Sequence, residues 1–259
     1  MKIVPIIASL ACACMLQQLA LAEDGKPKLA LAVGTEYTTG DYGGDQDIED
    51  FYVPVKAIVD IRRVQFRLTV PWLSVTAPEG TVITGPGGEP IPGPGVMKTS
   101  SGLGDVVASA TLRDVFSNRR LGLAMDLTGK VKFGTADESR GLGTGENDFA
   151  VQADLLKFAG PATFIGSLGY TFRGDPADFD LEDTLLASLG GTYAFGRDVR
   201  GGLFFDYRES SIGNDPIEEL SAFLSRRFND DWRLQFYVLS GFTDSGPQWG
   251  AGFRVRRSM

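Results

Sequence analysis

Apolar and polar residues alternate along most of the chain with a period of two. In the stretch 64–70 (VQFRLTV) every second side chain is apolar, and 121–132 repeats the pattern with Asp126, Lys130 and Lys132 among its polar positions. A helix would scatter these three charges among the apolar residues, whereas a strand places them on one face. The pattern therefore predicts a chain built from β-strands.

Twelve alternating segments follow one another, separated by turn-forming residues. A tilted strand of about 9–11 residues is long enough to cross a membrane, and the segments have about this length. Their predicted ranges are 28–38, 50–60, 63–75, 104–113, 121–133, 148–158, 161–172, 183–195, 199–210, 217–228, 232–242 and 248–257.

The connections between the segments alternate between short and long. The predicted turns on one side are 61–62, 114–120, 159–160, 196–198 and 229–231. The predicted loops on the other side are 39–49, 76–103, 134–147, 173–182, 211–216 and 243–247. The seven-residue turn 114–120 and the five-residue loop 243–247 depart from this rule. Short periplasmic turns opposite longer outer loops are typical of bacterial outer-membrane barrels.

The apolar faces of the segments fit a band that contacts lipid, and several aromatic residues lie near segment ends, where interfacial girdles form. These aromatic residues are Trp72, Tyr170, Tyr207, Trp232 and Trp249. We therefore expect an all-β fold, a transmembrane antiparallel up-and-down β-barrel of about 12 strands. Alternation does not show which face points inward, so a soluble periplasmic all-β protein remains the alternative.

The first 22 residues are typical of a secretory signal peptide. Lys2 is followed by a mostly apolar run, and Ala20-Leu21-Ala22 is a small-x-small cleavage site. The predicted organisation is a signal peptide, 1–22, and an outer-membrane barrel domain, 23–259. Both cysteines, Cys12 and Cys14, belong to the signal peptide, so the mature chain would have no disulfide. The expected location is the outer membrane of a Gram-negative bacterium.

The face opposite the apolar one carries charges of both signs, and a charge on the lipid face at mid-depth costs about 2–4 kcal/mol. We therefore expect these residues to line the lumen, and no basic stripe predicts an anion pore. A water-filled passage and a lumen filled by ion pairs both remain open. The candidate lumen-lining residues are Arg67, Asp126, Lys130, Lys132, Gln152, Asp154, Asp206, Arg208, Arg233 and Gln235.

Two of the predicted outer loops are acidic, and one is rich in glycine and proline. The carboxylates of 41–49 and 175–182 are expected to be solvated; clustered carboxylates also bind Ca²⁺, but the spacing of an EF-hand loop is absent. The stretch 84–95 (TGPGGEPIPGPG) is expected to form no regular structure and to be mobile. Its insertion into the pore mouth is the alternative.

Composition restricts the chemistry. The 259 residues include 33 glycines, which favour turns and strands over helices, and no histidine. Without histidine, most zinc sites and the usual nucleophile–base pairs are excluded. We therefore expect no enzyme, no catalytic residue, no cofactor and no metal site. The formal net charge of −8 does not favour nucleic acid as a partner.

Two groups of residues resemble known sequence patterns. The first pattern is similar to the C-terminal assembly signal of outer-membrane proteins and consists of Gln248, Gly250, Phe253 and Val255. Many of these proteins end on an aromatic residue, whereas this chain ends on Met259. The second pattern resembles sequence motifs of the outer-membrane transporter family named after the MetA pathway of phenol degradation. It consists of the stretches 101–106 (SGLGDV), 130–135 (KVKFGT) and 141–145 (GLGTG).

The family pattern has a Gly-Leu-Gly-Asp strand start, a Lys-x-Pro-Thr-Gly turn and a Gly-x-Gly-x-Gly loop. Here Gly134 replaces the usual proline and Ala136 the usual glycine. At Gly102 and Gly104 we expect positive φ angles or a bulge where the chain re-enters the sheet. The resemblance implies a barrel that takes up small compounds, often hydrophobic or aromatic.

The leading functional hypothesis is passive uptake of small molecules, hydrophobic or aromatic compounds among them, through an outer-membrane channel. The alternative within the membrane is a structural or adhesive barrel with a plugged lumen. Expected partners are outer-membrane lipid and lipopolysaccharide, the barrel-assembly machinery and an unidentified small-molecule solute.

Overall fold

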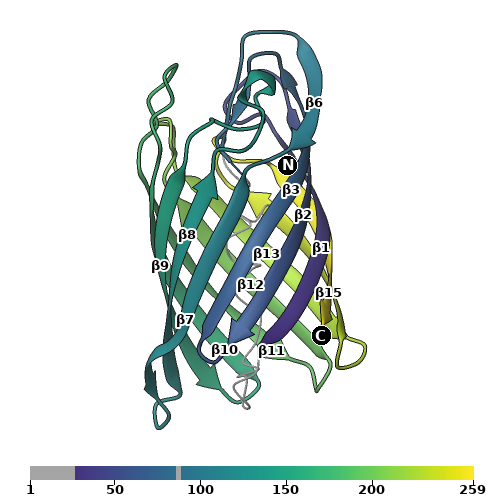
Figure 1. Cartoon of the computed structure of the whole chain (residues 1–259), viewed down its shortest axis with the longest axis vertical. Helices are drawn as coiled ribbons and strands as arrows, with labels where there is room; N and C mark the ends of the chain where they lie inside the picture. Colours follow the sequence, from purple (N-terminus) through teal and green to yellow (C-terminus); the bar gives the residue numbers. More distant parts are fainter. Residues whose placement is uncertain (1–26, 86–88) are drawn as a thin grey trace, which may run out of the picture.

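A computed structural model describes residues 27–85 and 89–259, so the predicted signal peptide 1–22 lies outside the described residues. Its long strands run obliquely around a common axis and enclose a lumen (Figure 1). The elements are β1 (Lys28–Gly40), β2 (Ile48–Ile61), β3 (Val64–Pro78), β4 (Val82–Ile83), β5 (Pro90–Ile91), β6 (Met97–Leu103), β7 (Val106–Asn118), β8 (Leu123–Phe133), the 3₁₀ helix η1 (Glu138–Arg140), β9 (Asp148–Ala159), β10 (Ala162–Phe172), β11 (Thr184–Ala194), β12 (Val199–Arg208), β13 (Ile217–Arg227), β14 (Trp232–Gly241) and β15 (Trp249–Ser258).

The sheet closes on itself with antiparallel pairing throughout. Each long strand pairs with its sequence neighbours, and β1 pairs with β15 from Ala30 opposite Ser258 to Thr39 opposite Trp249. Strands β6 and β7 both pair with β3 and together act as one interrupted strand. The result is a closed antiparallel barrel of 12 strands, as the sequence predicts. Closure leaves no open edge in the 12-stranded wall, whereas β6 pairs with β3 alone and β4 with β5 alone.

The two ends of the barrel differ in the length of their connections. The short connections, such as 62–63 between β2 and β3, define the turn end; the long ones, such as 134–147, define the loop end. Strand β1 starts and β15 finishes at the turn end (Figure 1). Among the described residues, no helix is long and apolar enough to cross a membrane.

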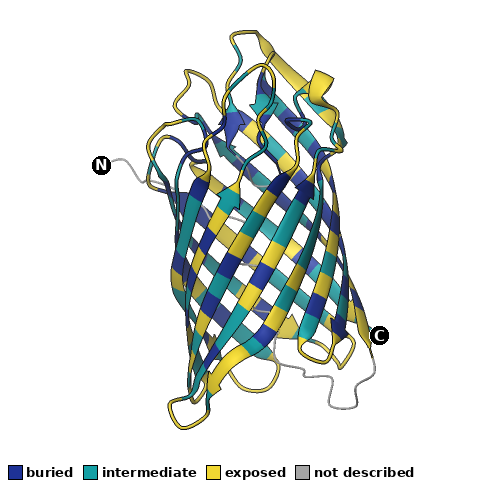
Figure 2. Ribbon diagram, turned by 60° about the vertical axis from the view of Figure 1, so that its left-hand side comes forward, coloured by how far each residue is buried: buried dark blue, intermediate teal, exposed yellow. Residues whose placement is uncertain are grey.

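Burial alternates along the strands as the sequence pattern requires (Figure 2). On β14, Phe236 and Val238 are 56% and 54% exposed, whereas Tyr237 and Leu239 between them are 8% and 1% exposed. Large apolar side chains cover the outer face of most strands. Such a continuous apolar surface suits contact with lipid and would make a soluble protein aggregate.

The connection predicted for 76–103 is mostly hairpin. Strand β3 continues to Pro78, and β6 pairs with it from Trp72 opposite Leu103 to Pro78 opposite Met97. Inside this connection, β4 and β5 form a two-residue hairpin, so the expectation of no regular structure in 84–95 is wrong. Alternation alone did not reveal these strands because β6 lies beyond the lipid band and its residues are mostly polar.

The turn predicted for 114–120 is also shorter than expected. Strand β7 runs to Asn118, and its pairing with β8 shifts between Leu112 and Phe116. Asp114 has a φ of 51° at this bulge, and its backbone N–H donates to the Asp126 carboxylate at 2.9 Å. The bulge breaks the period of two, which made the second half of the strand look like a turn.

The glycines of the stretch 101–106 have a different role from the one predicted. Neither Gly102 nor Gly104 is among the described residues with positive φ, although the strand is interrupted there. A Cβ at Gly104 would lie 2.7 Å from the Leu73 side chain, and one at Gly102 would lie 2.9 Å from that of Leu142. Close packing against the inner apolar residues therefore excludes larger side chains.

Candidate functional site: the barrel lumen and its outer mouth

The ten predicted lumen-lining residues lie in the strands that form the wall, and none of them is exposed. Four are buried and six are half-buried. The buried residues are Lys132, Gln152, Asp154 and Asp206, and the half-buried ones are Arg67, Asp126, Lys130, Arg208, Arg233 and Gln235. Their place in a conducting path stays a prediction.

Polar side chains on β8 and β9 form a connected row along one wall. The Lys130 ammonium donates to Gln152 Oε1 at 3.1 Å, and Gln152 Nε2 donates to the Asp154 carboxylate at 2.9 Å. Asp126 lies opposite Asp154 in the register and accepts the backbone N–H of Asp114. Hydrogen bonds therefore link Lys130 to Asp154 through Gln152, and two carboxylates, Asp126 and Asp154, lie side by side on this wall.

Arginines occupy the turn end of the lumen. The Arg67 guanidinium donates to Gln65 Oε1 at 2.9 Å. Asp60 accepts from Gln65 at 2.9 Å and forms a 2.5 Å ion pair with Arg113. The candidates Arg233 and Gln235 line a small cavity at the same end.

Four charged side chains form a buried network near the loop end, which we call the mouth network: Asp105, Lys132, Asp148 and Arg173. The Lys132 ammonium lies 3.5 Å from Asp105 and 3.1 Å from Asp148, and Arg173 lies 3.0 Å from Asp148. Arg173 also donates to the carbonyl oxygen of Thr84 at 3.1 Å. The network therefore joins the barrel wall to the connection between β3 and β6.

Burial and a neighbouring carboxylate have opposite effects on the pKa of Arg173, which follows the last residue of β10. Burial lowers the pKa of its guanidinium, and the Asp148 carboxylate counteracts this change. A buried ion pair is held by its geometry and its hydrogen bonds, because desolvation of both charges is costly. Lys132, predicted as a lumen-lining residue, is thus a member of an ion-pair network at the mouth.

Asp105 belongs to the Gly-Leu-Gly-Asp stretch and is fully buried. Its Oδ1 accepts the backbone N–H groups of Thr135 and Ala136, both at 2.9 Å. A Cβ at Gly143 would lie about 3 Å from both carboxylate oxygens. The carboxylate therefore fixes the turn after β8, and the glycine-rich loop packs closely against it.

Glu89 connects the same β3–β6 connection to the opposite side of the barrel. Its buried carboxylate accepts from the Ser210 hydroxyl at 2.9 and 3.0 Å, from the Ser211 backbone N–H at 3.0 Å and from the Asn214 amide at 3.4 Å. Described residues on both sides of the gap at 86–88 are therefore anchored to the barrel. These contacts support the alternative of an inserted loop over the expected mobile one.

Apolar side chains pack beneath this connection, from the first three strands and the loops above them. The cluster consists of Tyr42, Ile48, Tyr52, Leu73, Val75, Ala77, Ile83 and Leu142. Burial of the Tyr42 ring raises the pKa of its hydroxyl well above the ordinary value. The loop end thus has an apolar core, which was not predicted from the sequence.

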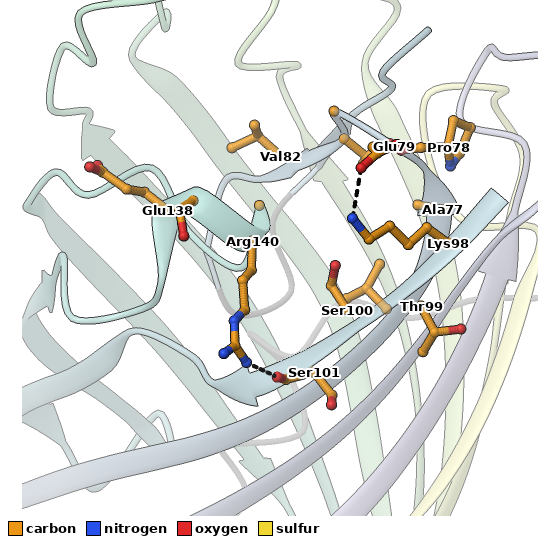
Figure 3. Close-up of a pocket in the computed structure, with 15 residues that line it drawn as sticks. Ala77, Pro78, Glu79, Val82, Lys98, Thr99, Ser100, Ser101, Glu138 and Arg140 are labelled. Carbon is orange, nitrogen blue, oxygen red and sulfur yellow. Dashed lines mark hydrogen bonds and ion pairs between the residues drawn. The ribbon is translucent and has the colours of Figure 1, made fainter. Parts of the chain in front are cut away.

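A polar cavity of about 460 Å³ lies outside this core, between the β3–β6 hairpin and η1 (Figure 3). Lys98 donates to the Glu79 carboxylate at 2.7 Å, and Arg140 donates to the carbonyl oxygen of Ser101 at 3.2 Å. The ion pair with Lys98 lowers the pKa of Glu79. Both ion-pair side chains are exposed, so the pair contributes little to stability.

The inner wall also carries aromatic side chains, although a wholly polar face was expected. Phe204 is buried and stacks with Phe223 at a centroid distance of 6.4 Å, and Ile165 packs against them. Glycine makes room for these rings: a Cβ at Gly202 would collide with Phe223. The half-buried Phe223 therefore adds an aromatic surface to the polar inner wall.

Sequence reasoning missed Asp105 as part of the mouth network and Glu89 as an anchor. Asp105 stands in a stretch that was assigned to turn chemistry, and Glu89 is the acidic residue within a run of glycine and proline. A single charge in an otherwise uncharged turn was the available indication. Its partners come from distant parts of the chain, so only the fold brings them together.

These features define the class of the protein: a closed 12-stranded barrel with an apolar outer face and a mixed polar and aromatic lumen, of the outer-membrane type. Residues 52–256 match the family model described as "Putative MetA-pathway of phenol degradation", and the chain belongs to this family. The resemblance inferred from the sequence is confirmed. No curated protein matches the sequence.

Solved structures of outer-membrane channels share the fold. The COG4313 outer membrane channel from Pseudomonas putida F1 is similar with a TM-score of 0.70 and 14% identity, over 93% of this chain and 100% of that one. The KdgM porin is similar with a TM-score of 0.50 and 10% identity, over 89% of this chain and 99% of that one. At these identities the likeness shows the fold alone.

Proposed function

We propose that the protein is a passive channel for small molecules in the outer membrane of a Gram-negative bacterium. The observation that carries the proposal is a closed barrel whose lipid-facing side is apolar and whose inner wall bears charged and amide side chains. A wall of this kind suits water and polar solutes. The similar solved structures are channels and porins, which supports transport over catalysis.

The solute class we favour is small molecules with an aromatic ring. Phe223 is half-buried on the inner wall and stacks on the buried Phe204, and the family description refers to phenol degradation. Aromatic contacts contribute about 0.5–1.5 kcal/mol beyond burial. This energy corresponds to a preference of about two- to tenfold for an aromatic solute.

Liposome swelling tests the proposal with two neutral solutes that cross lipid poorly, methyl glucoside and phenyl glucoside. We expect the wild-type protein to admit both and to favour the phenyl compound relative to its size. Phe223→Leu should reduce that preference by about two- to tenfold, whereas Phe205→Leu, on the outer face of the neighbouring strand β12, should not change it.

A folded barrel that admits neither solute and shows no single-channel steps in planar bilayers would contradict the channel proposal. If both variants changed the preference for phenyl glucoside equally, the proposed aromatic preference would be wrong, but the channel proposal would stand. The second candidate function is a structural barrel with a plugged lumen, and the anchored connection at the mouth favours it. That candidate predicts a folded protein without conductance.

A further inference from the structure

Four arginines converge at the turn end of the lumen from three strands. Arg233 on β14 lies directly opposite Arg256 on β15 in the register. Arg254 belongs to a neighbouring row that continues through Gln235 and Ser225 to Arg200 on β12. The inner face of the wall thus presents four guanidinium groups within two adjacent rows.

These arginines surround a cavity of about 20 Å³, which is room for about one water-sized species. The described residues that line it are Arg200, Phe223, Ser225, Arg233, Gln235, Arg254 and Arg256. This lining contains no acidic side chain. The polar groups that face the cavity are mainly hydrogen-bond donors, which match an anion.

Charges in the surroundings add to the positive potential. The charged groups that act on Arg256 are Asp60, Arg67, Arg113 and Arg233. Asp60 is already paired with Arg113 at 2.5 Å, so these two charges largely offset one another. The sequence predicted no basic stripe, but the fold brings arginines that are distant in sequence to one end of the lumen.

Guanidinium groups keep their charge at all physiological pH values and bind carboxylates and other oxyanions through paired N–H donors. A ring of cations in a narrow passage attracts anions and repels cations. We propose that the four arginines form an anion-binding constriction that gives the channel selectivity for small anions, such as chloride or the carboxylate group of a small solute. This inference rests on the proposed channel function.

Reversal potentials across planar bilayers test the inference, measured in gradients of potassium chloride and of potassium acetate. We expect both anions to permeate more readily than potassium. Arg254→Gln and Arg256→Gln should each lower the anion-to-cation permeability ratio by about threefold, the ratio expected for one charge at about 6 Å in water. Arg200→Gln supplies a third variant if either of these fails to fold.

The matched control is Arg257→Gln. Arg257 follows Arg256 on the same strand, but its guanidinium lies over the Trp232 ring, 5.5 Å from the centroid, on the outer face. This variant should keep the wild-type ratio. Heat-modifiable migration on gels would show that each variant is folded.

The outcomes separate the two proposals. Single-channel steps in a wild-type protein that prefers potassium or neither ion would overturn the anion site and leave the channel function intact. Equal ratios in wild type and in the inner variants would also overturn the site. A folded wild-type barrel without conductance overturns the channel function and the selectivity together.

Discussion

At the loop end of the lumen, each buried cation of the mouth network has a carboxylate partner within 3.5 Å, whereas at the turn end four arginines line a cavity without an acidic side chain among its described lining residues. Charged residues therefore have different roles at the two ends of the lumen. Paired charges hold the connection between β3 and β6 in place. At the turn end, four guanidinium groups share the lining of one cavity, and we propose that their combined positive potential acts on a solute.

The largest effect on stability is expected from Lys132→Met. This change removes the ammonium group that lies between the buried carboxylates of Asp105 and Asp148. Breaking a buried pair from one side costs about 3–5 kcal/mol of unfolding free energy. Urea unfolding in lipid vesicles measures the change. Lys157→Met, at an exposed position of β9, is the control and should cost far less. A loss below about 1 kcal/mol would show that the mouth network is not structural.

A smaller effect is expected from Glu89→Ala, which removes the acceptor of hydrogen bonds from Ser210, Ser211 and Asn214. Hydrogen bonds to a charged group contribute about 1.5–3 kcal/mol each. In the variant, water at the mouth would form some of the hydrogen bonds that Glu89 no longer accepts. We expect a loss of about 1.5–3 kcal/mol and faster limited proteolysis within 79–96. Glu79→Ala, on the same connection but exposed, is the control. Unchanged proteolysis would contradict the anchoring role of Glu89.

The smallest effect is expected at the exposed Glu79–Lys98 pair. Because Lys98 lowers the pKa of Glu79, any stability from the pair is present at neutral pH and is lost as the pH falls through the lowered pKa. Glu79→Gln should remove this pH dependence and leave the unfolding midpoint at pH 7 nearly unchanged. A clear loss of stability at pH 7 would mean that this pair resembles the mouth network.

The strands were largely predictable because a barrel that spans a membrane imposes a strict alternation on each of them. Segment 161–172, for example, agrees with β10 within one residue. The prediction failed where that constraint is absent. Strand β6 consists mostly of polar residues, and the bulge in β7 breaks the period at Asp114. Candidate residues of the inner wall followed from the same alternation, but their partners did not.

Twelve strands of membrane-spanning length and the separation of apolar from polar faces could be predicted from the chain alone, because both depend on local periodicity and turn chemistry. Closure of the sheet is the pairing of β1 with β15, which lie at opposite ends of the chain. The tertiary structure decided which charges meet. Lys132 is paired with Asp105 and Asp148, whereas Arg200, Arg233, Arg254 and Arg256 gather around one cavity. Neighbours across a barrel depend on strand register and tilt. The alternation along one strand shows which side chains face inward, but it does not show which side chains on other strands they meet.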